Sequence, residues 1–239
     1  MSQKKTLLKY TKYVMWGTVA LIPPAAFFYL LEFYTHNPFA EVRPWAQLFN
    51  IVLFELLAGI FLCITERLRT AYRIEGTAAL VFGLANAYVV RFRTNPLVPW
   101  DILSWRTAVS VSGNYDFTPD TRMIVVTILF LALIIGLQPV KFKIGRPGFF
   151  KRCLPGVVLG AVLVMFAGTL QQENFQNEHR LYNKLFTPVF MTQVDGIPVT
   201  FVMNLAYMSI EKPQKYSVGE AKEFLKKYEE PQETEESID

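Results

Sequence analysis

The residues best suited to chemistry lie in a segment between two apolar runs. The candidate site residues there are arginines, acids, aromatic residues and an amide: Arg91, Arg93, Asp101, Trp105, Arg106, Asn114, Tyr115, Asp116 and Phe117. Guanidinium groups bind phosphate through charge-assisted hydrogen bonds, and tryptophan is enriched at the level of lipid headgroups. The segment therefore predicts contact with anionic lipid at a membrane surface. Simple anchoring at that surface is the alternative.

Glu55 is a second candidate, because it stands alone in the middle of the apolar run 45–64. A carboxylate is costly inside a membrane, so we expect it to face other helices. It could relay protons or ions, or it could be a structural group hydrogen-bonded to a neighbour such as Asn86. The structural interpretation is favoured, since the chain shows no internal repeat typical of transporters. Glu32 and Glu75 lie near the ends of apolar runs and are expected to reach the interface.

The chain has two cysteines and two histidines, which predict neither a disulfide nor a His/Cys metal site. Cys63 and Cys153 fall at one end of the apolar runs, where we expect the cytoplasm and a reducing environment. His36 and His179 fall at the other end, so the four side chains are not expected to converge on a zinc ion.

Composition indicates a membrane protein whose helices would position these residues. Of 239 residues, 52% are hydrophobic and 18% are charged, and the mean hydropathy is +0.25. The apolar residues form five runs of about the length that crosses a bilayer as a helix. We predict an all-α fold with transmembrane helices over 14–34, 45–64, 74–90, 123–138 and 153–170.

The basic residues predict the orientation of these spans. One side receives twelve, in the short cytoplasmic N-terminus 1–13 and after the second and fourth spans: Lys4, Lys5, Lys9, Lys12, Arg67, Arg69, Arg73, Lys141, Lys143, Arg146, Lys151 and Arg152. The other side receives five: Arg43, Arg91, Arg93, Arg106 and Arg122. The excess lies inside, which predicts a cytoplasmic N-terminus and an external C-terminus. Basic residues placed this way are topology signals and do not indicate nucleic-acid binding.

The segments outside the spans have distinct expected structures. An external interfacial hairpin over 91–122 would contain an amphipathic helix capped by Asp101 and ending at Gly113. Thr118-Pro119-Asp120 would cap the fourth span, with Thr118 as the N-cap. External helices are expected over 171–228, and 196–210 is expected to lie on the membrane surface or against an ectodomain, with a short sixth span as the alternative. The acidic tail 229–239 is typical of a linker.

Two segments carry a resemblance to a known family. The first contains an Arg, a Pro-Leu-x-Pro-x-Asp pattern and an Asn-Tyr-x-Phe ending, here Arg91, Pro96, Leu97, Pro99, Asp101 and 114–117. The second contains a Gly-x-x-x-x-Phe-x-x-Asn pattern and a Pro-x-x-Tyr-Ser pattern, here Gly196, Phe201, Asn204, Pro213, Tyr216 and Ser217. Over nearly its whole length the chain resembles the membrane half of lipoteichoic acid synthases and related phosphoglycerol transferases.

The resemblance implies a role in building the bacterial cell wall. In that family a five-helix domain of the cell membrane anchors an external sulfatase-like α/β domain. That domain uses a metal-activated threonine, with manganese or magnesium, to transfer glycerol phosphate from phosphatidylglycerol to a polymer. This chain ends where the catalytic domain would begin, so no catalytic or metal-binding residue is carried over. We expect a piece of a longer enzyme; a free-standing membrane scaffold that binds a separate catalytic partner, or a transporter using Glu55, are the alternatives.

Overall fold

The computed structural model describes residues 20–104, 106, 110, 113, 115–140, 142–143, 149–184 and 187–208. The chain divides into two compact units, Met1–Ala206 and Tyr207–Asp239. Only Tyr207 and Met208 of the second unit are described. All statements below on packing concern the first unit.

The described secondary structure is helical, with no strand and one isolated bridge between Arg67 and Lys143. The long helices are Ala20–Glu32, α3 (Pro44–Thr65), α4 (Leu68–Arg93), α7 (Thr121–Gly136) and α8 (Phe149–Leu170). The short ones are α2 (Pro38–Glu41), α5 (Pro99–Leu103), α9 (Glu173–Glu178), α10 (Pro188–Asp195), α11 (Ile197–Asn204) and the 3₁₀ helix η2 (Leu205–Met208). The all-helical prediction is confirmed for these residues.

Each predicted span corresponds to a long helix, with differences at the ends. α3 and α7 begin and end within two residues of the predicted limits, and α8 begins four residues early. α4 is longer at both ends than predicted and includes Arg69, Arg73, Arg91 and Arg93, because arginine is a good helix former. The first predicted span is described only from Ala20 onward.

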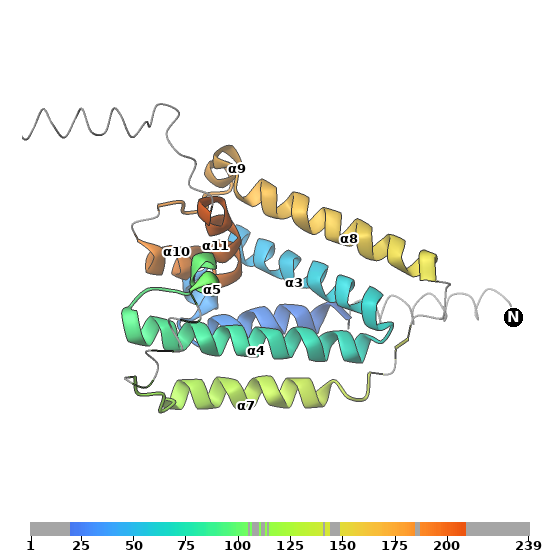
Figure 1. The fold of residues 1–239 in the computed structure, drawn as a ribbon, viewed down its shortest axis with the longest axis horizontal. Helices are drawn as coiled ribbons and strands as arrows, with labels where there is room; N and C mark the ends of the chain where they lie inside the picture. Colours follow the sequence, from blue (N-terminus) through green and yellow to red (C-terminus); the bar gives the residue numbers. More distant parts are fainter. Residues whose placement is uncertain are drawn as a thin grey trace, which may run out of the picture. The chain divides into compact units, whose positions relative to one another are not determined.

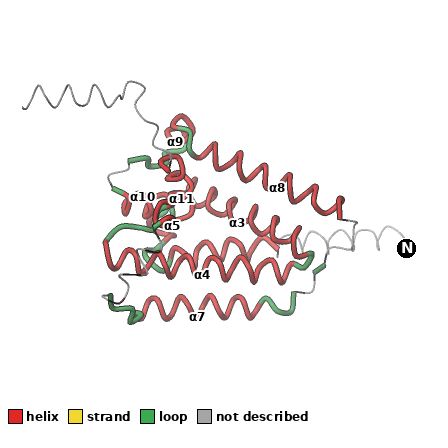
Figure 2. Tube along the Cα trace, in the orientation of Figure 1, coloured by secondary structure: helices red, strands yellow, loops and turns green. Residues whose placement is uncertain are grey.

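Successive long helices run in opposite directions, so alternate chain connections meet at the same end. Figure 1 shows α5, α9, α10 and α11 together at the end where α3 begins and where α4 and α8 finish. Figure 2 shows loops joining these short helices there. We call this the short-helix end. It is the end that we predict to be external.

Close helix contacts form the core beside α4. The Ala20–Glu32 helix and the turn after it contribute Phe27 and Tyr34, both buried. A Cβ at Gly76 would lie 2.6 Å from the ring of Phe27, and one at Gly83 would lie 2.7 Å from the ring of Tyr34. Glycine at these positions lets the aromatic rings pack directly on the α4 backbone. Phe130 of α7 stacks on both rings, which brings three helices together.

Among the described residues, two helices are long and apolar enough to cross a bilayer by length and composition: α3 and the Cys153–Leu170 part of α8. Only 28% of the apolar window in α3 and 6% of that in α8 is buried. Val164 and Met165 of α8 are each 72% exposed. A core helix of a soluble protein would bury such side chains, because exposing them to water is unfavourable. Within the described residues, these apolar faces are left uncovered.

Two local predictions were wrong. Asp101 is the third residue of α5 and not its N-cap, because Pro99 already occupies the first helical position. Asp120, and not Thr118, caps α7 by accepting a hydrogen bond from Met123 N. Within the predicted segment 196–210, α11 packs against α3, α5 and α8, and 209–210 lie outside the described residues. The predicted helix 102–113 lies largely outside the described residues.

Candidate functional site

Arg93 and Asp101 join the end of α4 to α5. The Arg93 guanidinium donates to both carboxylate oxygens of Asp101, with one contact at 2.8 Å, and to Pro96 O at 3.3 Å. Asp101 also accepts a hydrogen bond from Val98 N at 2.9 Å. The Arg93 side chain remains 45% exposed. A guanidinium has more N–H donors than these acceptors occupy, so it retains donors for a ligand.

Arg91 contacts the second half of the hairpin, residues 115–118, which leads into α7. Its guanidinium donates to Thr118 O at 2.6 Å and lies 3.6 Å from the Asp116 carboxylate. Asp116 accepts hydrogen bonds from the amide and hydroxyl of Thr118 at 2.8 and 2.6 Å, which hold the pKa of this exposed carboxyl below its ordinary value. Phe92 stacks on Tyr115 and meets Phe117 edge to face. We call Arg93–Asp101 and Arg91–Asp116 the hairpin pairs.

The structure corrects the predicted partners of the acids within the apolar runs. Asn86 accepts a hydrogen bond from Leu97 N at 2.8 Å and does not pair with Glu55. Glu55 Oε1 is buried without a hydrogen-bond partner. Glu32 and Glu75 are buried and do not reach an interface, because neighbouring helices cover them. Asn86 thus holds the chain where it leaves α4.

A pocket lies between the segment after α4 and the helices α10 and α11. It has a volume of about 190 Å³, and its lining residues are Arg93, Asn95, Pro96, Val98, Trp100, Pro188, Met191 and Asn204. Asn204 is 2% exposed, and its side chain makes no hydrogen bond within the part of the chain that the structure describes. Asn204 lines the pocket with a free amide, so it is suited to meet a polar ligand there.

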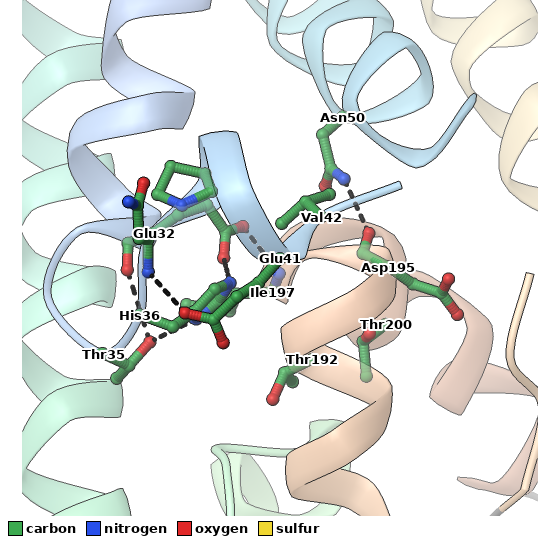
Figure 3. Close-up of polar contacts among 12 residues, drawn as sticks. Glu32, Thr35, His36, Glu41, Val42, Asn50, Thr192, Asp195, Ile197 and Thr200 are labelled. Atoms are coloured by element: carbon green, nitrogen blue, oxygen red, sulfur yellow. Dashed lines mark hydrogen bonds and ion pairs between the residues drawn. The ribbon is translucent and has the colours of Figure 1, made fainter. Parts of the chain in front are cut away.

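The start of α11 is held by side chains from two other helices (Figure 3). Glu32 Oε1 accepts a hydrogen bond from Ile197 N at 2.7 Å. Asn50 Oδ1 accepts one from Val199 N at 2.9 Å. α11 follows Gly196, which has no side chain to cap it. Glu32 and Asn50 therefore satisfy the free N–H groups of the first turn, where a carboxylate also favours the helix dipole.

The turn between α10 and α11 fits closely around Asn50. Asn50 Nδ2 donates to Asp195 O and to Ala46 O, both at 2.7 Å. Gly196 has φ +79°, and a Cβ there would lie 2.5 Å from Asn50 Nδ2. Only glycine fits this conformation and this space without strain. We call Glu32, Asn50, Asp195 and Gly196 the buried latch.

The carboxylate of Asp195 fastens the loop before α10. Its Oδ2 accepts a hydrogen bond from Tyr182 N at 2.6 Å, and its Oδ1 has no hydrogen-bond partner. Burial raises the pKa of Asp195 to about 7, although the Tyr182 hydrogen bond and the charge of Arg43 act in the opposite direction. Arg43 supports the same loop through Arg180 O. The carboxyl therefore titrates near neutral pH.

His36 completes the polar contacts around Glu32. Its Nε2 lies 3.1 Å from Glu32 Oε2, and its Nδ1 lies 3.0 Å from the Thr35 hydroxyl. Arg122 reaches the same turn and donates to Thr35 O at 3.0 Å. The turn after the first helix is thus tied both to α11 and to the start of α7.

The structure separates the predicted site residues into two groups. Arg93 lines the pocket and is paired with Asp101, whereas Arg91, Tyr115, Asp116 and Phe117 lie together on the other half of the hairpin. Trp105 and Asn114 lie outside the described residues. Arg106 is described and has an interaction partner, but it does not line the pocket. The predicted single surface is therefore two neighbouring surfaces.

Sequence reasoning did not identify the buried latch. Its one local signal was Asp195-Gly196-Ile197-Pro198, where glycine before an early proline indicates a turn and a helix start. Asn204 had appeared only as part of the second resembling segment. Among the described residues no group of three or more His, Cys, Asp or Glu is arranged to hold a metal ion.

No family model, curated protein or solved structure matches the chain. The likeness to lipoteichoic acid synthases therefore remains a prediction from the two segments. Those segments meet in the structure: Pro96, Val98 and Trp100 of the first and Asn204 of the second line the same pocket.

Proposed function

We propose that this chain is the five-span membrane domain of a lipoteichoic acid synthase-like phosphoglycerol transferase. Its spans place the N-terminus in the cytoplasm and the short-helix end outside. It anchors an external sulfatase-like catalytic domain and presents the headgroup of phosphatidylglycerol to it. The manganese or magnesium of that chemistry belongs to the catalytic domain.

The exposed apolar faces support the membrane placement. α8 shows Leu154, Val157 and Val164 to its surroundings, and α7 shows Ile128 and Ile135, each exposed by more than 50%. Lipid would cover these side chains, whereas water would penalise them by about 25 cal/mol for each Å². The alternating directions of the long helices support a bundle that crosses repeatedly (Figure 1).

The main support for the proposal is that residues from both resembling segments line the same pocket. A volume of about 190 Å³ leaves room for a small polar group. Arg93 offers a guanidinium for phosphate, and the buried amide of Asn204 offers donors and an acceptor for hydroxyl groups. These are the two chemistries of a glycerol phosphate headgroup.

Lipid preference tests this assignment. The purified protein is placed in nanodiscs of phosphatidylcholine with a small fraction of phosphatidylglycerol, and a headgroup photo-crosslinker records the lipid bound near the pocket. Asn204→Leu should reduce crosslinking to phosphatidylglycerol about tenfold, since a buried polar contact to the ligand is lost. Asn177→Leu, an exposed change in α9 at the same end, should leave it unchanged. Equal crosslinking in all three proteins would contradict the proposal.

A free-standing scaffold for a separate catalytic partner is the second candidate, because the pocket would serve either arrangement. The reading frame after the Asp239 codon separates the two. A continuation encoding a sulfatase-like domain supports the enzyme, and a stop codon followed by an unrelated gene supports the scaffold.

A further inference from the structure

A second, larger groove lies along α4. It has a volume of about 810 Å³, and its lining residues are Thr70, Arg73, Ile74, Thr77, Ala78, Val81, Phe82, Ala85, Leu97 and Ile102. The α4 members recur at three- and four-residue spacing, which places them on one stripe of the helix. Leu97 and Ile102 lie at the short-helix end of this stripe. The groove is apolar for most of its length.

The polar end of the groove holds a cation without a partner. Arg73 is half-buried and makes no hydrogen bond or ion pair within the described ranges. The neighbouring Arg69 instead donates to Gln138 O at 3.3 Å. A partly desolvated guanidinium is stabilised by a phosphate that its paired N–H groups can bind. The groove therefore combines an apolar stretch with a positively charged end that can bind an anion.

The dimensions fit one lipid chain. From Arg73 to Ala85, α4 rises by ~18 Å at about 1.5 Å per residue. One leaflet contributes half of the ~30 Å hydrocarbon core, about 15 Å. A chain that starts at a phosphate on Arg73 would thus follow the groove to the middle of the bilayer and slightly beyond.

We propose that this groove is a binding site for an anionic phospholipid of the cytoplasmic leaflet, with its phosphate on Arg73 and one acyl chain along α4. The inference rests on the proposed membrane placement, but its phosphate site at Arg73 lies toward the other end of α4 from the headgroup pocket. The lipid is a bound component of the domain and not the donor of the transfer reaction. Its phosphate neutralises Arg73, and its chain covers the exposed stripe of α4.

The other candidates from this chain have the wrong charge or lie on the wrong side. The N-terminal segment 1–13 contains four lysines and no acid, so it would repel Arg73. The acidic tail 229–239 belongs to the external side in the proposed topology. Basic positions at the cytoplasmic ends of membrane helices attract anionic headgroups, which agrees with a lipid in this place.

Native mass spectrometry of the full chain in detergent tests the site. The Asn204→Leu protein, whose headgroup pocket should no longer hold phosphatidylglycerol, is delipidated, supplied with that lipid and used as the background for the variants below, and it should retain one molecule. Arg73→Gln should weaken retention about tenfold, as expected for one charge-assisted contact. Arg67→Gln removes the same charge from an exposed position outside the groove and should change retention by less than about twofold.

A second pair of variants tests the channel while leaving Arg73 intact. Ala78→Trp fills the groove and should release the lipid, whereas Ala132→Trp adds the same bulk to the exposed face of α7 and should not. Retention unaffected by Arg73→Gln, an equal loss in both arginine variants, or equal retention in both tryptophan variants would overturn the site. The Asn204→Leu variant should retain this lipid, so failure here is distinct from failure of the headgroup pocket.

Discussion

The buried latch and the hairpin pairs hold short helices against the same end of the bundle by different means. The latch side chains Glu32, Asn50 and Asp195 are fully buried. In the hairpin pairs, the Arg93 side chain is 45% exposed and that of Asp116 is 69% exposed. Both arrangements satisfy backbone groups at helix ends, but only the latch does so away from solvent.

This difference indicates that the buried latch and the hairpin pairs have different roles. Breaking a buried hydrogen bond leaves a desolvated group unpaired, whereas a broken surface pair is rehydrated. The latch therefore fixes α11, and with it Asn204, in one position. The hairpin pairs are replaceable by other partners, so Arg93 can exchange contacts with water for contacts with a phosphate. The pocket therefore lies between α11, which the latch holds in one position, and the hairpin, whose exposed contacts can be exchanged.

The largest effect should come from Gly196→Ala. The φ of +79° and the 2.5 Å approach to Asn50 Nδ2 leave no place for a methyl group. We expect a loss of at least about 3 kcal/mol in unfolding free energy from backbone strain and overpacking. Thermal unfolding in detergent measures it. Gly113→Ala, where a Cβ would meet open space, is the control in the hairpin, and equal stability of the two variants would remove the contrast between the regions.

Stability measured over a pH series should distinguish the two regions, because the contributions of Asp195 and Asp116 change with pH in opposite directions. The pKa of Asp195 is about 7, above its ordinary value of 3.8, so the folded protein holds this proton more tightly than the unfolded chain. Its contribution to stability is full below pH ~4 and is lost as the pH rises toward 7, by about 2 kcal/mol between pH 5 and 7. Asp195→Asn should flatten the difference in melting temperature between those pH values.

The hairpin acid predicts the opposite slope. Hydrogen bonds from Thr118 lower the pKa of Asp116, so its contribution is present above the ordinary pKa and fades as the pH falls through the lowered one. Asp116→Asn should leave the slope between pH 5 and 7 as in the wild type. A wild-type slope retained in Asp195→Asn would instead place the titration elsewhere.

The smallest effect should come from the Arg93–Asp101 pair. A double-mutant cycle with Arg93→Gln and Asp101→Asn should give a coupling free energy of about 0.5–1 kcal/mol, because the pair is partly exposed. Urea unfolding of the four proteins measures it. A coupling as large as the effect of Gly196→Ala would mean that the hairpin is as rigid as the latch.

Hydrophobic runs predicted the long helices because each run is uniform enough to indicate a helix without tertiary information. The latch could not be predicted in this way. Glu32 contacts Ile197, 165 positions away, and only the fold shows that a helix start needs the carboxylate there.

The candidate site residues remain a prediction from the sequence. The pattern around Pro99 drew attention to the segment and its arginines and acids, but it showed neither which arginine pairs with which acid nor that Arg91 and Arg93 point to different halves of the hairpin. Two residues that are two positions apart on a helix point to different sides, so the directions of Arg91 and Arg93 depend on α4 continuing as far as Arg93. The sequence alone did not fix where this helix ends. Asn204 became a candidate for the pocket only when the structure placed it in the same lining as Arg93.

Sided labelling of cysteines tests the central claim, that the short-helix end faces outward from a membrane-spanning bundle. In intact cells a membrane-impermeant maleimide is applied to a variant with Cys63 and Cys153 replaced by alanine and Asn177→Cys added. The account predicts labelling of this variant without permeabilisation, and labelling of the native Cys63 and Cys153 only after it. Labelling of the native cysteines in intact cells, with Asn177→Cys protected, would contradict the account.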